Sequence, residues 1–157
     1  MIRTRFAPSP TGYLHIGSLH TALFNYLFTR HSGGTFILRI EDTDRERYVP
    51  DAVEKLVGIL AEFGLNPDEG PVLENGSIAE KGDFGPYVQS KRLDIYKEHA
   101  KRLVADEKAY YCFCDAEMLD RVRKDHAAQN LPPRYDWHCR SLPPFVVNGQ
   151  LASGKPF

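Results

Sequence analysis

The chain has 157 residues, which is about the length of one domain. Its composition, with 42% hydrophobic and 26% charged residues, is that of a globular protein and excludes a disordered or fibrous chain. The formal net charge of −1 gives no general attraction to polyanions, so a nucleic-acid partner would need a local basic face.

Cysteine usage and the N-terminal segment indicate where the protein works. The three cysteines are an odd number, which excludes a complete disulfide framework and favours reduced thiols, free or bound to a metal. Residues 1–5 are charged and lead into a proline-containing segment, which is not the pattern of a secretory signal. No apolar run approaches the roughly 18 residues of a membrane span. We therefore expect a soluble cytoplasmic protein without a membrane partner.

The first forty residues predict a βαβ unit. Residues 2–6 form a short run that ends at a proline-containing loop, which is typical of a buried strand. Apolar residues recur at helical spacing over residues 16–27, and the glycine pair at 33–34 ends that helix. Residues 36–40 have the composition of a second buried strand. Because a helix connects them, the two strands should be parallel.

Two helices and a loop are predicted downstream of the βαβ unit. Residues 50–63 begin with a proline and carry apolar residues along one side, which is typical of a helix that packs on a core. Residues 66–85 are rich in Gly, Pro, Asn and Asp and predict a surface loop. A third helix is expected to begin with Ser90 as its N-cap.

The composition of the chain changes near Ala109. Cysteines appear, and a charged helical stretch follows over residues 115–129, which predicts a small insertion rather than more sheet. We therefore divide the chain into residues 1–108, the first half of an α/β core, and residues 109–157, the insertion with the beginning of a further strand at its end. A parallel sheet of two or three strands needs cover on both faces, so we expect the chain to be part of a longer protein.

The loop after the first strand has the residues of a phosphate site. Pro10, Thr11 and Gly12 lead to His15 and Gly17 at the entrance of the helix. A helix N-terminus offers free N–H groups and a partial positive charge, and glycine lets a ligand approach the backbone closely. His15 could donate a hydrogen bond to a phosphoryl oxygen as charge builds there. An isolated His-X-Gly is more often an ordinary helix start, so this interpretation depends on the surrounding residues.

Those surrounding residues resemble a known family. Residues 5–17, with the sequence RFAPSPTGYLHIG, resemble the active-site motif of glutamyl-tRNA synthetases, which are class I aminoacyl-tRNA synthetases. The glutaminyl enzymes typically carry Pro-Glu-Pro-Asn-Gly where this chain has Pro-Ser-Pro-Thr-Gly. Ser18 stands in place of the last histidine of the class I "HIGH" signature, which is usual in the glutamyl branch. Residues 33–47 and 85–93 resemble two further family motifs, and the similar blocks cover nearly all of residues 3–140.

The resemblance implies a fold and a reaction. The fold would be the class I synthetase Rossmann-like α/β core, a parallel sheet with helices on both faces, followed by the start of a small zinc-binding connective insertion. The reaction would be ATP-dependent activation of glutamate, with Mg²⁺, to glutamyl-adenylate and transfer of the glutamyl group to tRNA(Glu) by a monomeric enzyme. The family's lysine-rich "KMSKS" loop and its anticodon-binding domain would lie beyond Phe157, so residues 1–157 alone should be inactive.

The resemblance also implies site residues. Those implied to bind glutamate are Arg5, Ala7, Ser9 and Glu41. Those implied to bind ATP are Pro10, Thr11, Gly12, His15, Gly17 and Ser18, with His15 as the catalytic residue. Those implied to contact the tRNA end are Asp44 and Arg47. The chemistry agrees, because guanidinium and hydroxyl groups donate to carboxylates and a carboxylate accepts from the ammonium group of an amino acid.

The acidic residues of this loop allow a second interpretation. Glu41, Asp42 and Asp44 are three carboxylates in four residues, and such a group can hold Mg²⁺. The arginines Arg45 and Arg47 would offset that charge, and the family uses the loop for amino-acid and tRNA-end contacts. We therefore favour recognition over metal binding or acid–base hydrolysis at this loop.

The insertion carries three soft metal ligands and a phenol, which are Cys112, Cys114, Cys139 and Tyr135. Structural zinc needs four ligands in a closed tetrahedral set, and the spacing alone leaves ordinary half-buried thiols as an equal alternative. Zinc-bearing members of the glutamyl family resemble the chain at all four positions, which favours structural zinc. Many of them carry a histidine where this chain has Ser141, so the fourth ligand stays open between Tyr135, His138 and none.

Three other functions fit parts of the sequence. A shortened paralogue that glutamylates a modified base of tRNA(Asp) shares the first motif and the zinc positions, but residues 45–47 and 85–87 fit the full-length enzyme better. A non-catalytic zinc module that binds nucleic acid would not need a loop for ATP phosphates. A small nucleotidyltransferase would carry a histidine in place of Ser18.

Overall fold

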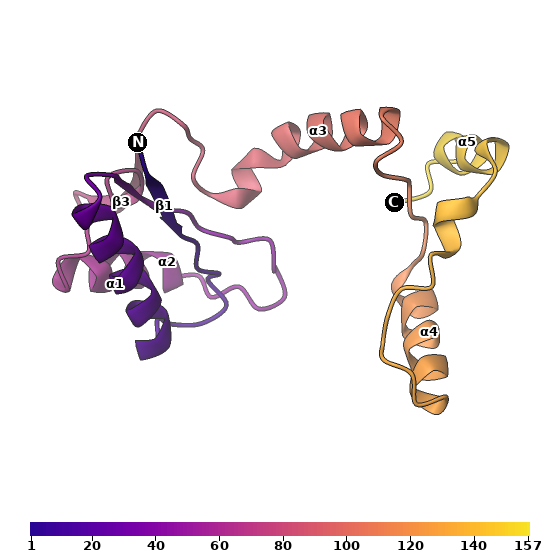
Figure 1. Cartoon of the computed structure of the whole chain (residues 1–157), viewed down its shortest axis with the longest axis horizontal. Coiled ribbons are helices and arrows are strands. Elements are labelled where there is room, and N and C mark those ends of the chain that lie inside the picture. The colour runs from indigo at the N-terminus through magenta and orange to yellow at the C-terminus, as the bar shows by residue number, and fades with distance from the viewer. The chain divides into compact units, whose positions relative to one another are not determined.

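The computed structural model describes all residues from Met1 to Phe157 (Figure 1). Its regular elements in chain order are β1 (Arg3–Phe6), α1 (Ile16–His31), β2 (Thr35–Leu38), α2 (Ala52–Glu62), β3 (Gly70–Glu74), β4 (Ser77–Lys81), the 3₁₀ helix η1 (Gln89–Arg92), α3 (Leu93–Ala105), α4 (Ala116–Ala128), the 3₁₀ helix η2 (His138–Ser141) and α5 (Pro144–Ala152). The chain forms two compact units, unit 1 (Met1–Tyr96) and unit 2 (Lys97–Phe157). The division falls within α3, and a domain boundary at residues 108/109, where the composition changes, stays a proposal.

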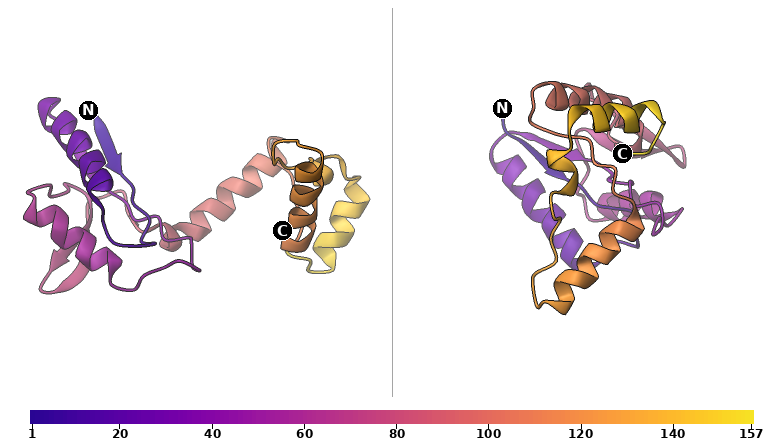
Figure 2. Two further views of the ribbon diagram at one scale, coloured as in Figure 1. Left: turned by 90° about the horizontal axis from the view of Figure 1, so that it is seen from below. Right: turned by 90° about the vertical axis from the view of Figure 1, so that its right-hand side faces the viewer.

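Unit 1 is built on the predicted βαβ unit. β1 and β2 pair in parallel, with Arg3 opposite Thr35 and Phe6 opposite Leu38, so the predicted orientation of the strands is confirmed. The connecting helix α1 ends where Gly33 takes a φ of +60°, a left-handed conformation that glycine adopts without strain. α1 packs against both strands, and the two views of Figure 2 again place it alongside β1.

β2 is the central strand of unit 1. On one side its ladder with β1 continues past the last strand residue, because the Glu41 backbone N–H donates to the Pro8 carbonyl at 2.9 Å. On the other side an isolated parallel bridge joins Ile40 to Val88. The segment around residue 41 is therefore held from both sides, between the loop after β1 and the segment that precedes η1.

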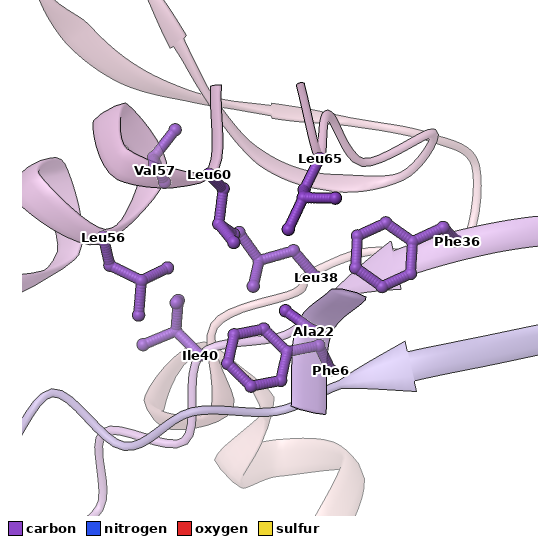
Figure 3. Packing of buried hydrophobic residues seen from close by; sticks show 9 residues of the cluster. All are labelled: Phe6, Ala22, Phe36, Leu38, Ile40, Leu56, Val57, Leu60 and Leu65. Atoms are coloured by element: carbon purple, nitrogen blue, oxygen red, sulfur yellow. The ribbon is translucent and has the colours of Figure 1, made fainter. Parts of the chain in front are cut away.

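Alternation along the strands separates an apolar face from a polar one. The apolar face forms the core with residues from α1, α2 and the following turn: Phe6, Ala22, Phe36, Leu38, Ile40, Leu56, Val57, Leu60 and Leu65. Figure 3 shows Leu56 and Leu60 of α2 directed toward Leu38 and Ile40. Residues that alternate with the buried ones point to the opposite face of the strands.

That opposite face is polar. Arg5 is exposed and Arg39 is half-buried, and the Arg39 guanidinium donates to the Tyr96 hydroxyl, near the start of α3, at 3.0 Å. α1 and α2 pack against the apolar face, and Tyr96 of α3 contacts the polar face through this hydrogen bond. The polar face is also where Glu41 falls by the same alternation.

A β-hairpin occupies residues that were predicted to be loop. β3 and β4 pair antiparallel, with Val72 opposite Ala79, and the turn between them is Asn75-Gly76. Both turn residues have positive φ, 51° and 79°, as a type I′ hairpin turn requires. The prediction of a surface loop over residues 66–85 was wrong because the Asn-Gly pair that suggested a loop also makes the tightest hairpin turn.

The third helix begins before the predicted position. η1 starts at Gln89 with Val88 as its N-cap and leads directly into α3. Ser90 lies inside η1 and does not cap it, so that prediction was wrong. Its hydroxyl instead donates to the carboxylate of Asp42 at 2.6 Å.

Unit 2 contains helices and no strand. α4 is capped as the predicted charged helix should be, because the Asp115 carboxylate accepts from the Met118 backbone N–H at 2.8 Å. α5 was not predicted, although Pro144 suits the first position of a helix. Residues 154–157 hold a turn and irregular structure, so the strand expected to begin there is absent. None of the helices in either unit is long and apolar enough to cross a bilayer.

Candidate functional site

A cleft of about 690 Å³ lies at the N-terminus of α1 in unit 1. Seven of the residues predicted to bind ATP or glutamate line it: Ala7, Ser9, Thr11, Gly12, His15, Gly17 and Ser18. Pro10 is buried and does not line the cleft, and neither do Arg5 and Glu41. The structure therefore brings most of the predicted loop together around one open space.

His15 caps α1 with its own side chain. Its Nδ1 accepts the Gly17 backbone N–H at 3.2 Å, and its Nε2 lies 3.0 Å from the Ser18 hydroxyl oxygen. A neutral imidazole that accepts at Nδ1 carries its proton on Nε2, so Nε2 is the donor. The imidazole is exposed at the cleft, where this donor can reach a ligand oxygen.

This cap changes which groups of α1 can meet a phosphate. The Gly17 N–H, expected to be free, is already taken by His15, and the N–H groups of Ser18 and Leu19 both donate to the His15 carbonyl at 3.0 Å. The partial positive charge of the helix end remains. A Cβ on residue 17 would stand 3.1 Å from the His15 ring carbon Cε1, so a side chain there would press against the ring that caps the helix.

Two backbone bonds fix the loop that precedes α1. Glu41 donates to the Pro8 carbonyl and Val49 donates to the Pro10 carbonyl, each at 2.9 Å. Both donors follow β2 in the chain, so the segment after β2 is hydrogen-bonded to the loop after β1 at two points. The loop is therefore held in place by the segment that follows β2.

A cluster that the sequence did not predict closes the outer side of the loop. The Tyr13 hydroxyl donates to an Asp51 carboxylate oxygen at 3.2 Å. Lys55 lies 2.7 Å from the other carboxylate oxygen and 4.2 Å from the centre of the Tyr13 ring. The hydrogen bond from Lys55 is the main cause that lowers the pKa of Asp51. Tyr13 and Asp51 are 38 residues apart, and no local pattern in the sequence signals such a contact.

Arg5 and Glu41, the two charged residues predicted to bind glutamate, share the polar face of the parallel strands. Arg5 lies in β1 opposite Ile37, and Glu41 follows β2. The Glu41 carboxylate is half-buried, with Oε1 3.7 Å from an Arg39 guanidinium nitrogen. One cation and one anion on the same face suit a ligand that carries both signs of charge.

The three carboxylates of residues 41–44 do not converge. Glu41 pairs with Arg39, Asp42 accepts two hydrogen bonds from Ser90, and Asp44 accepts from the Arg47 backbone N–H at 3.2 Å and from its Nε at 2.8 Å. The hydrogen bond from the Arg47 side chain is the main cause that lowers the pKa of Asp44. These three groups do not form a shared set of metal ligands.

The three cysteines of unit 2 form one cluster with Tyr135. The three sulfur atoms lie within 4.8 Å of one another, and those of Cys114 and Cys139 are 3.5 Å apart. The Tyr135 hydroxyl oxygen lies 3.4 Å from the Cys112 sulfur and 3.5 Å from the Cys114 sulfur. His138 is exposed and is not part of the cluster. Of the two candidates for a fourth ligand, Tyr135 is the one at the cluster.

Comparison with known proteins places the chain in a family. The model of the family described as "tRNA synthetases class I (E and Q), catalytic domain" matches residues 1–157. The chain belongs to this family. The resemblance noted in the sequence and the predicted class I synthetase fold are thereby confirmed.

The similar proteins are class I synthetases named for glutamate. A "Glutamate--tRNA ligase" of Clostridioides difficile strain 630 is 48% identical over 157 residues, which are 99% of this chain and 32% of the relative. A protein of the same name from Dehalococcoides mccartyi strain CBDB1 is 55% identical over 141 residues, covering 90% of this chain and 28% of the relative. The chain thus spans about a third of the length of these relatives.

A solved class I synthetase has the same fold as the chain. The crystal structure of a glutamate tRNA ligase from Elizabethkingia meningosepticum, in complex with its amino acid, superposes with a TM-score of 0.84 and is 41% identical. The match covers 99% of this chain and 31% of that one.

The cysteine cluster of unit 2 has a composition and a size that could hold a zinc ion. A tetrahedral zinc with bonds of about 2.3 Å to sulfur separates its sulfur ligands by about 3.8 Å, which agrees with the spacing in the cluster. The hydrogen bond from Tyr135 is the main cause that lowers the pKa of Cys112, whereas burial raises the pKa of Cys114 to about 11 and raises that of Tyr135. A metal cation would reverse the last two effects, because it favours the deprotonated ligands.

Proposed function

We propose that the protein to which this chain belongs is a glutamate–tRNA ligase, which activates glutamate with ATP and transfers it to tRNA(Glu). The main supporting observation is the imidazole of His15 at the mouth of the cleft. Its Nδ1 accepts the Gly17 N–H, so Nε2 carries the proton, which it donates to the Ser18 hydroxyl in this structure and would donate to a phosphoryl oxygen when ATP is bound. The names and the similarity of the relatives support the choice of glutamate as the amino acid.

In the activation step, an oxygen of the glutamate α-carboxylate attacks the α-phosphorus of ATP. A new P–O bond forms to glutamate, the bond to the β-phosphate bridge breaks, and pyrophosphate leaves with the electron pair, as glutamyl-adenylate forms. Negative charge grows on the phosphoryl oxygens during this step. His15 Nε2–H would donate to one of them, and a donor fixed before the reaction stabilises that charge without reorganisation. Mg²⁺ bound to the ATP phosphates would neutralise part of the remaining charge.

Glutamate would bind along the polar face of the strands, next to the cleft. Arg5 would pair with one carboxylate and the Ser9 hydroxyl would donate to it, while Glu41 would accept from the ammonium group. Ala7 would leave room between these groups, because it lines the cleft with a single methyl. ATP would lie along Thr11, Gly12, Gly17 and Ser18, while Pro10, which is buried directly before Thr11, would only shape the loop. The terminal ribose of the tRNA would then take the glutamyl group.

Two further assignments belong to the same proposal. Asp44 and Arg47 would contact the tRNA end, and Cys112, Cys114, Cys139 and Tyr135 would hold zinc. Zinc in a closed set of four ligands supplies structural stability and takes no part in the reaction. We expect a monomeric, cytoplasmic enzyme.

Glutamate-dependent exchange of pyrophosphate into ATP tests the proposed function. The protein is expressed from its complete gene, and exchange is measured in the presence of tRNA with glutamate, glutamine and aspartate in turn. Exchange with glutamate alone, followed by charging of tRNA(Glu), is the expected result. Exchange with glutamine, or transfer to tRNA(Asp) instead of tRNA(Glu), would contradict it and point to the glutaminyl branch or to the shortened paralogue.

Substitution of His15 and Arg5 separates their proposed roles. His15→Ala should lower kcat by a factor on the order of 10²–10³ with little change in glutamate binding, since the lost donor acts on the transition state. Arg5→Ala should instead raise the KM for glutamate, since its guanidinium pairs with the carboxylate in ground and transition states alike. His20→Ala, an exposed position on the same helix, is the control. If the first two variants behave alike, the assigned roles are wrong.

A further inference from the structure

Asp42 is a buried carboxylate that the proposed chemistry does not use. Its residue is only 7% exposed. Oδ1 accepts the Ser90 backbone N–H at 2.8 Å, and Oδ2 accepts the Ser90 hydroxyl at 2.6 Å. Burying a charge is costly unless hydrogen bonds replace its water, so the presence of Asp42 at this position implies that the pair with Ser90 is formed in the folded protein.

The pair continues the sheet where backbone pairing stops. Ile40 donates to the Tyr87 carbonyl at 3.0 Å and accepts from the Gln89 N–H at 2.8 Å. Two residues after Ile40 and one residue after Gln89, the Asp42 side chain takes the place of a backbone carbonyl and receives the Ser90 N–H. The segment after β2 is therefore bound to residues 87–90 up to Asp42.

Residues 87–90 are a firm support for this bond. Tyr87 is buried, its hydroxyl donates to Glu69 at 2.7 Å, and its backbone N–H donates to Glu80 at 2.5 Å. Burial raises the pKa of the Tyr87 hydroxyl, so it stays protonated as the donor to Glu69. The other side of the segment is bound through Glu41 to Pro8.

We propose that Asp42 is a positioning residue, which holds Glu41 and the segment up to Arg47 in place by its bonds to Ser90. The role of Glu41 as acceptor for the ammonium group of glutamate rests on the proposed function, whereas the anchoring of the segment does not. Asp42 lies on the buried side of the strand and Glu41 on the polar side, so Asp42 does not touch the ligand itself.

Three substitutions separate hydrogen bonding from charge. Asp42→Ala removes both acceptors. Asp42→Asn keeps the shape, and its amide can accept the Ser90 N–H and donate to the Ser90 hydroxyl, so it should retain most of the anchor. Ser90→Ala removes the hydroxyl alone and leaves the backbone bond, and it is a second variant if Asp42→Ala does not fold. Asp83→Ala, an exposed aspartate, is the matched control.

Hydrogen exchange of the protein expressed from its complete gene tests the anchor. In Asp42→Ala the amides of residues 41–47 should exchange about tenfold faster than in the parent, while those of α2 stay unchanged. Ser90→Ala should give a smaller change, and Asp42→Asn and Asp83→Ala should resemble the parent. Unchanged exchange in both Asp42→Ala and Ser90→Ala would overturn the proposal, whatever the protein catalyses.

Pyrophosphate exchange kinetics test the consequence for glutamate. Asp42→Ala should raise the KM for glutamate about tenfold and leave the KM for ATP within a factor of about two, and Asp42→Asn should restore most of the loss. Equal rises for both substrates would overturn the assigned role, since they indicate general damage. So would an Asp42→Asn variant as impaired as Asp42→Ala. If the parent itself shows no glutamate-dependent pyrophosphate exchange, the proposed function fails. The hydrogen-exchange measurements alone then test whether Asp42 anchors the segment.

Discussion

The two units hold their candidate sites in different ways. In unit 1 the cleft lies beside a core of nine clustered buried residues, and backbone hydrogen bonds join the loop after β1 to the segment after β2. In unit 2 the buried residues are Phe113 and Cys139, and Cys139 belongs to the sulfur cluster. A unit of this size with so small a core needs another source of stability, such as a metal. The stability of the cleft in unit 1 should therefore depend on core packing, and the stability of unit 2 should depend on metal binding at the cysteine cluster.

Removal of the metal should have the largest effect and should be confined to unit 2. We expect about one zinc per chain in protein purified without added metal, and a chelator should abolish the protection of α4 and α5 against hydrogen exchange. Apparent free energies of structural zinc are about 10 kcal/mol or more, which exceeds what this small core supplies. Cys139→Ser should reproduce the effect, and Ser141→Ala, two residues away, should not. Less than a tenth of the zinc, with full protection retained, would show that the cluster is not a metal site.

Truncation of a core side chain should lower the stability of unit 1 and leave unit 2 unchanged. Leu60 in α2 is fully buried against β2, so Leu60→Ala removes packed methyl groups and leaves a cavity. We expect the free energy of unfolding of unit 1 to fall by about 2–5 kcal/mol with no change in unit 2, as measured by denaturant titration followed by hydrogen exchange. Leu73→Ala, on the exposed side of β3, is the matched control. A similar loss in both units would show that they unfold as one.

The smallest expected effect is the loss of the α4 cap, which tests whether this helix or the cysteine cluster stabilises unit 2. Asp115 caps α4, and Asp115→Ala should lower the stability of this helix by about 1 kcal/mol. Faster exchange of the first-turn amides of α4 is the measurement, and Asp125→Ala, exposed on the same helix, is the control. Because α4 buries no residue fully, the fraying should stay local as long as zinc is bound. Loss of zinc from the variant would instead show that the helix supports the cluster.

Local signals in the sequence predicted the parts of the fold that depend on neighbours in the chain. The helix from Ile16, the strands on either side of it and the charged helix within residues 115–129 follow from the spacing and the kind of residues within each segment. The clustering of the cysteines with Tyr135 was also expected from their spacing and was favoured by the resemblance, although the sequence left His138 open as an alternative. The assignment of individual residues to ATP and glutamate stays a prediction.

Contacts between distant segments could not be predicted from the sequence. Ser90 looked like an N-cap because its hydroxyl suits that position, but the Asp42 carboxylate, 48 residues earlier, takes the hydroxyl instead. The bond from Tyr13 to Asp51 is hidden for the same reason. The hairpin turn at Asn75-Gly76 is a different case, since its signal was present in the sequence and was assigned to a loop.

The His15 imidazole has two roles, because it caps α1 through Nδ1 and carries the proposed donor on Nε2. His15→Ala removes both the proton on Nε2 and the acceptor that begins the helix, so a loss of activity and a loss of about 1 kcal/mol of stability come together. Asparagine separates them, because it is a good helix cap but has no imidazole to reach the phosphate. A comparison of His15 with Asn at this position therefore measures the contribution of the imidazole to the reaction without a change in helix capping.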